Sequence, residues 1–71
     1  MAGKLPMIAP KLRVKNEEER KRVIAIATRM VAAEIEAGEF DPENNDELVA
    51  RTRAACRDAL RIYRAAEEFI S

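Results

Sequence analysis

The stretch LVARTRAACRDALRIYRAAEEF, residues 48–69, decides the fold because its apolar positions recur with a heptad spacing. Steps of four and three residues alternate along it, as they do on one face of a long helix. The face consists of Leu48, Thr52, Ala55, Ala59, Ile62, Ala66 and Phe69. Alanines occupy its middle, and small residues there let a second helix approach closely. We therefore predict a helix over about residues 42–70 that packs against another helix.

The partner helix is predicted upstream, over about residues 17–37. Asn16 can cap its first turn, and three glutamates follow where the helix dipole favours negative charge. Gly38 suits the left-handed residue that ends a helix, and Asp41 with Pro42 suits the start of the next one. The sequence therefore predicts an all-α fold, an antiparallel two-helix hairpin over residues 16–71 with a turn at 38–41.

The apolar arc of the first helix is too wide for a single neighbour. It covers more than half of the helical wheel, whereas packing against one helix needs a stripe of roughly 100°. Its members are Val23, Ile24, Ile26, Ala27, Met30, Val31, Ala33, Ile35 and Ala37. We therefore expect this helix to contact a second partner besides its own hairpin neighbour.

Chain length and composition also favour association. A chain of 71 residues buries only about 60% of its unfolded surface, and small domains usually need a further source of stability. Cys56 is the only cysteine and histidine is absent, which excludes an internal disulfide and a zinc site. We predict a homodimer that forms a four-helix bundle, with Ile24, Val31, Ile35 and Glu34 at the dimer interface.

Glu34 has two interpretations, because it falls near the middle of the apolar arc and a charge there must be paired or reach water. It is either a polar residue that specifies the dimer interface or the partner of a cation within the chain. That cation would be Arg20 or an arginine of the second helix, and we favour this pairing.

Residues 1–15 are predicted to form an extended N-terminal arm. Pro6 and Pro10 disfavour a helix there, and residues 11–15 alternate basic and apolar side chains with a period of two. This pattern is typical of a short strand, or of an arm that lays alternate side chains on another surface. The alternative is a partly disordered tail.

Catalysis, a cofactor and a metal site are not expected. The lone thiol of Cys56 lies beside the heptad face, where a cysteine behaves as a small buried apolar residue. The only serine is Ser71, and two glycines cannot form a phosphate-binding loop. The acidic residues 41–47 resemble a calcium loop in composition alone, since glycine and glutamate are missing at its sixth and twelfth positions.

The arginines of the second predicted helix carry the candidate binding surface. Taking about 100° per residue, four of them share one arc opposite the alanines: Arg53, Arg57, Arg61 and Arg64. Helical spacing predicts local ion pairs of Glu47 with Arg51, of Asp58 with Arg61 and of Arg64 with Glu68. Arg53 and Arg57 are left without an evident local partner.

We therefore predict a small non-enzymatic interaction module, an adaptor, inhibitor or anti-activator of a larger protein. Arginine forks pair with carboxylates, so the expected partner has an acidic surface. The candidate partner-binding residues are Arg53, Arg57, Arg61, Arg64, Lys11, Arg13 and Lys15. No membrane span or signal peptide is evident, and we expect a cytoplasmic protein.

Two alternatives remain open. The basic alternation of residues 11–15 followed by two helices resembles the ribbon–helix–helix repressors, which implies a DNA-binding strand whose Leu12 and Val14 face the core. A sequence pI near 6.3 is low for such a domain, so we place a protein partner first. The other alternative is a structural subunit of a larger assembly, in which a different chain covers the wide apolar arc.

Overall fold

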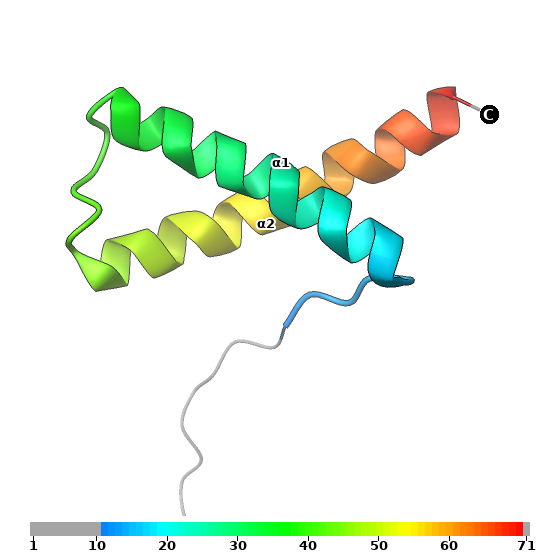
Figure 1. The fold of residues 1–71 in the computed structure, drawn as a ribbon, viewed down its shortest axis with the longest axis horizontal. Helices are drawn as coiled ribbons and strands as arrows, with labels where there is room; N and C mark the ends of the chain where they lie inside the picture. The colour runs from blue at the N-terminus through cyan, green and yellow to red at the C-terminus, as the bar shows by residue number, and fades with distance from the viewer. Residues whose placement is uncertain (1–10, 71) are drawn as a thin grey trace, which may run out of the picture.

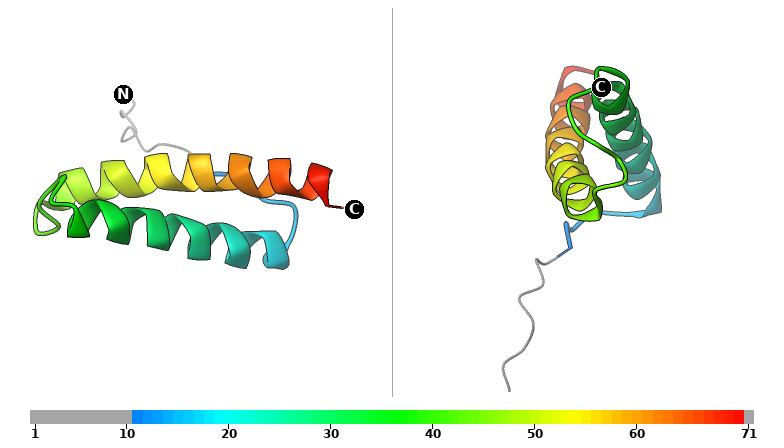
Figure 2. Two further views of the ribbon diagram at one scale, coloured as in Figure 1. Left: turned by 90° about the horizontal axis from the view of Figure 1, so that it is seen from above. Right: turned by 90° about the vertical axis from the view of Figure 1, so that its left-hand side faces the viewer.

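The computed structural model describes residues 11–70, which form two antiparallel helices. Helix α1 spans Glu17–Glu36 and helix α2 spans Asn45–Phe69. The helices cross near their middles, and the connecting segment closes one end of the hairpin while the other end stays open (Figures 1 and 2). The predicted all-α hairpin is confirmed. Neither helix has the length and apolar composition needed to span a bilayer within residues 11–70.

Helix α1 begins and ends at residues suited to those positions. The side chain of Asn16 accepts a hydrogen bond of 2.8 Å from the Glu19 N–H and so caps the first turn. At the other end Gly38 has a φ of 73°, in the left-handed region, and its N–H donates to the Ile35 carbonyl at 3.0 Å. An added Cβ at Gly38 would meet nothing within 4 Å, so backbone conformation rather than space favours glycine there.

Helix α2 begins three residues later than the sequence predicts. Asp41 does not cap it, because its carboxylate accepts from the Glu43 N–H at 2.9 Å and its carbonyl accepts from Asn44. These bonds close a separate turn around Pro42. Asn44 is the cap instead, since its side chain accepts from the Glu47 N–H at 3.2 Å. The connection between the helices is correspondingly longer than the predicted turn at 38–41.

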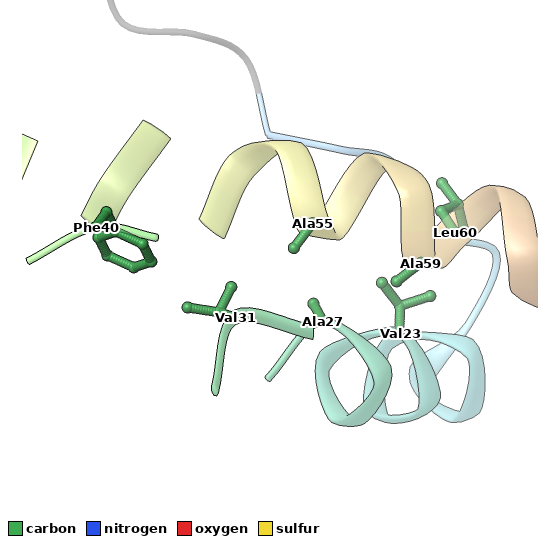
Figure 3. Packing of buried hydrophobic residues seen from close by; sticks show 7 residues of the cluster. All are labelled: Val23, Ala27, Val31, Phe40, Ala55, Ala59 and Leu60. Carbon is green, nitrogen blue, oxygen red and sulfur yellow. The ribbon is translucent and has the colours of Figure 1, made fainter. Parts of the chain in front are cut away.

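A single row of apolar side chains lies between the helices (Figure 3). The row consists of Val23, Ala27, Val31, Phe40, Ala55, Ala59 and Leu60. Ala27, Ala55 and Ala59 lie at the crossing, and Ala59 is 0% exposed. Their missing side-chain bulk allows the helix backbones to approach each other there.

Phe40 completes this row from the connecting segment. Its ring is only 7% exposed and closes the space between the helices at the turn end of the hairpin (Figure 3). The sequence pattern places Phe40 in the predicted turn at 38–41 and assigns it no role in the core. The longer connection thus contains one residue of the core and, after it, the separate turn at Asp41.

Candidate interaction surface

The predicted arginine row of α2 divides into free and paired members. Arg53, Arg57 and Arg61 are exposed and form no ion pair with any residue between 11 and 70. The expected pair of Asp58 with Arg61 is therefore absent from this part of the chain. Arg53, Arg57 and Arg61 follow one another at intervals of four, so their charges stack along one side of the helix.

Arg64 does not belong to this free row, because it is paired within the chain, and its role in partner binding stays a prediction. Its guanidinium donates two hydrogen bonds of 3.3 Å to the carboxylate of Glu19 on α1 and one of 3.4 Å to the Arg13 carbonyl. The expected local pair with Glu68 is not formed among the described residues. A buried carboxylate on the other helix offers Arg64 a fixed, two-pronged acceptor, and this outweighs a neighbour on its own exposed surface.

Glu19 lies at the centre of a group of contacts at the open end of the hairpin. We call this group the open-end clasp, and it consists of Glu19, Arg64, Asn16 and the Lys15 backbone. The Glu19 side chain is 1% exposed, and its Oε1 also accepts from the Lys15 N–H at 2.8 Å. The Arg64 hydrogen bonds and the Lys15 N–H lower the pKa of Glu19 below its ordinary value of 4.5, against the opposing effect of burial. The same pair raises the pKa of Arg64. The carboxylate is therefore held in its charged form.

Residues 11–16 lie against the second half of α2. Val14 packs against the core row, and the Lys15 ammonium pairs with Glu67 at 3.4 Å. Leu12 is exposed, as are Lys11 and the side chain of Arg13. In the single chain, residues 11–16 contain no strand. The rest of the predicted arm, residues 1–10, lies outside the described residues.

A second clasp holds the turn end, and it pairs Glu34 with a cation of its own chain. Arg51 of α2 pairs with Glu34 of α1 at 3.4 Å and with Glu39 at 3.3 Å, and it donates to the Glu39 carbonyl. Its guanidinium carbon also lies 5.1 Å from the centre of the Phe40 ring. The expected Glu47 partner is replaced by these contacts. Glu34 is thus paired with an arginine of the second helix, as favoured above.

Replacing Arg51 with lysine is expected to destabilise the hairpin although it keeps the charge. An ammonium cannot serve Glu34, Glu39 and the ring together, so the free energy of unfolding should fall by about 1 kcal/mol. Urea titration followed by circular dichroism measures this loss. Arg53→Lys is the matched control, expected within about 0.5 kcal/mol of the wild type, and equal losses in both variants would contradict the clasp.

One face of the hairpin carries an open apolar groove with a volume of about 300 Å³. Both helices line it, and none of its lining residues is charged: Ile24, Ala27, Thr28, Val31, Ala32, Ile35, Thr52 and Cys56. We call this surface the groove face. The sequence pattern places Thr52 on the apolar face of the second helix and Cys56 beside it, but it does not show that both share a groove with α1.

Three of the four predicted dimer-interface residues lie in this groove. Ile24 is 45% exposed, Ile35 is half-buried, and Val31 lies on the floor with its side chain already buried by its own chain. Glu34 does not line the groove, because its carboxylate turns towards Arg51. The apolar part of the predicted interface is therefore brought together, and its single charge is not.

The sequence pattern does not predict the roles of two buried residues in the clasps. Glu19 belongs to the open-end clasp, and the Phe40 ring lies under Arg51 in the clasp at the turn end. Glu19 precedes Val23 by four residues and Ala27 by eight, so helical periodicity already places it on the buried face. That signal was available, since a buried carboxylate requires a cation. Phe40 gave no periodic signal because it belongs to neither helix.

Nothing among the described residues groups three acidic or cysteine side chains as a metal ion's ligands would be grouped. Comparisons of the chain with protein-family models, with curated proteins and with solved structures gave no match.

Proposed function

We propose that this protein is a non-enzymatic interaction module that acts as a helical homodimer on a larger protein with an acidic surface. The observation that carries the proposal is the free row of Arg53, Arg57 and Arg61. Arg51 and Arg64 of the same helix are paired, so α2 supplies more positive charge than its own fold uses.

The free row has a cost that a partner would relieve. Like charges four residues apart on a helix destabilise it by about 0.2–0.5 kcal/mol per pair, and Arg53, Arg57 and Arg61 make two such pairs. Carboxylates from a partner would bind the guanidinium groups in bidentate fashion and remove the repulsion. A row of planar forks on a rigid helix suits an acidic protein surface better than it suits a nucleic-acid backbone, because the sequence pI is near 6.3.

The homodimer is part of the proposal because the chain leaves several large apolar side chains exposed. Ala59 is 0% exposed, whereas Ile24, Ile62 and Phe69 are 45%, 52% and 90% exposed. A core of seven residues that includes three alanines is small for a stable domain. A second hairpin stacked on the first would form the four-helix bundle expected from the sequence.

Reversing the charge of the row is expected to abolish partner binding without unfolding the hairpin. The double variant Arg53→Glu with Arg57→Glu should bind an acidic protein partner at least about tenfold more weakly, since each buried charge contact is worth about 1.4 kcal/mol or more. Fluorescence anisotropy with a labelled poly-glutamate peptide gives a defined first measurement. A duplex DNA of equal charge, titrated in parallel, measures the competing function.

The matched control is Arg22→Glu with Arg29→Glu, which changes the net charge equally on exposed positions of α1. It should retain peptide binding, and circular dichroism should show unchanged helicity in both double variants. Equal weakening in the two variants would show a nonspecific charge effect. Tighter binding of the DNA than of the peptide would overturn the proposal in favour of a nucleic-acid partner.

A further inference from the structure

We infer that the groove face binds a second copy of this chain in the antiparallel direction, with the turn end of each hairpin beside the open end of the other. This inference rests on the homodimer proposed above and adds its face and its direction. Three features of the described residues carry it: the uncharged floor of the groove, the exposed aliphatic residues beside it, and the unequal charge of its two ends.

The floor of the groove suits a dry protein contact. Its lining holds eight uncharged residues, and its only side-chain hydroxyls are those of Thr28 and Thr52, one on each helix. Ile24 lies in the groove on the side of the open end. Val49, which is 39% exposed, precedes Thr52 by three residues and Cys56 by seven, so it extends the apolar strip along α2 towards the turn end.

The two ends of the hairpin carry opposite charge. Residues 34–47, which contain the turn, hold seven acidic residues and no basic one. Two of these acids, Glu34 and Glu39, pair with Arg51 of α2, which leaves five. At the open end, residues 11–22 hold six basic residues against three acidic ones. Two of those acids, Glu17 and Glu18, pair with Arg20 and Arg22, and Glu19 is used by Arg64. Lys11 and Lys21 remain exposed and without an ion pair among the described residues.

This gradient selects a second copy turned end for end. A two-fold axis through the middle of the groove face sets the same surface of each copy against the other. In the antiparallel direction each acidic turn meets the basic end of the partner copy, whereas the parallel direction would set acidic turn against acidic turn. A face with an apolar middle and oppositely charged ends is therefore complementary to itself. A second copy supplies an apolar surface for the groove and an oppositely charged end for each end of the hairpin.

Two neighbouring alanines of α1 provide a matched test of the face. Ala32 lines the groove and Ala33 does not, while both are exposed and both lie in the interior of the same helix. Ala32→Glu places a carboxylate in the apolar contact of both copies at once. We expect it to weaken dimerisation at least a hundredfold, measured by sedimentation equilibrium. Ala33→Glu should change the dissociation constant by less than threefold.

The outcomes separate the face from the homodimer itself. A wild-type chain that sediments as a monomer up to 100 μM, roughly the range of weak dimers, would overturn both the homodimer and its groove. A dimeric wild type with a dimeric Ala32→Glu variant would overturn the groove alone. Equal dissociation of the Ala32→Glu and Ala33→Glu variants would also count against this face, because Ala33 lies outside the groove.

The direction is tested by zero-length crosslinking with a carbodiimide, which joins carboxylates to lysines in contact. Crosslinks between copies are identified by mixing ¹⁴N- and ¹⁵N-labelled protein before the reaction. We expect links from acids of residues 36–47 to Lys11, Lys15 or Lys21 of the other copy. Links from these lysines to Glu17 or Glu18 of the other copy would show the parallel direction, and a dimer without any link between copies would equally contradict the proposed contact of the two ends.

Discussion

An Ala59→Leu variant should lose a large part of the hairpin's free energy of unfolding. Ala59 is 0% exposed and lies where the two helices cross (Figure 3). A leucine there adds three carbons to a contact that has no room for them, so the helices must separate or the side chain must leave its preferred rotamers. Overpacking of this kind costs about 1–3 kcal/mol, and the small core supplies only about 3–5 kcal/mol.

Circular dichroism at 222 nm and urea titration measure this loss. Ala50→Leu is the matched control, because Ala50 is an exposed alanine of the same helix and leucine is nearly as good a helix former. The control should stay within about 0.5 kcal/mol of the wild type. An Ala59→Leu variant as stable as the control would mean that the helices do not touch at this residue.

The hairpin itself could be predicted because its determinants are local or periodic. The heptad over residues 48–69 gives a helix and its inner face, and the stereochemistry at Gly38 ends α1 where the sequence places the end. The predicted start of α2 is wrong because Asp41 and Asn44, three residues apart, are equally good capping residues. In the structure Asp41 closes a separate turn with Glu43 and Asn44, and helical spacing alone does not distinguish the two caps.

The candidate surfaces were predicted less completely, because their contacts run between the two helices. Spacing rules consider one helix at a time, so they paired Arg51 with Glu47 and Arg64 with Glu68. The structure pairs both arginines across the hairpin, where buried or half-buried carboxylates hold them more firmly. The prediction that Arg53 and Arg57 lack a partner is correct within the described residues. The α1 side of the groove follows from the wide apolar arc of that helix. Which α2 residues join it depends on how the two helices cross, and the sequence pattern does not give that crossing.

A Glu19→Gln variant should be less stable than the wild type at neutral pH and should lose that disadvantage in acid. The wild-type carboxylate binds Arg64 and the Lys15 N–H, and these contacts lower its pKa in the folded state below 4.5. A glutamine keeps the size but leaves the Arg64 guanidinium without its ionic acceptor. We expect the melting temperature at pH 7 to fall by roughly 5–10 °C.

The sign of the pH dependence follows from the lowered pKa. The stabilising effect of the charged Glu19 is fully present above pH 4.5, the ordinary value, because the side chain is then ionised in both the folded and the unfolded chain. As the pH falls below 4.5, Glu19 takes up a proton first in the unfolded chain. The stabilisation then decreases progressively, and it is lost completely once Glu19 of the folded chain is protonated too. Melting curves of both proteins between pH 7 and pH 2 should therefore show a constant difference at first and convergence in acid.

The matched control for this titration is Glu18→Gln, because Glu18 is exposed and pairs only with Arg22 on its own helix. An exposed pair of this kind contributes little to stability because water and salt screen it, so the control should follow the wild-type curve closely. A difference between Glu19→Gln and the wild type that stayed constant down to pH 2 would mean that shape and not charge makes Glu19 stabilising. If the difference had already vanished above pH 4.5, the result would contradict the lowered pKa of Glu19, and with it the clasp that joins the open ends of the two helices.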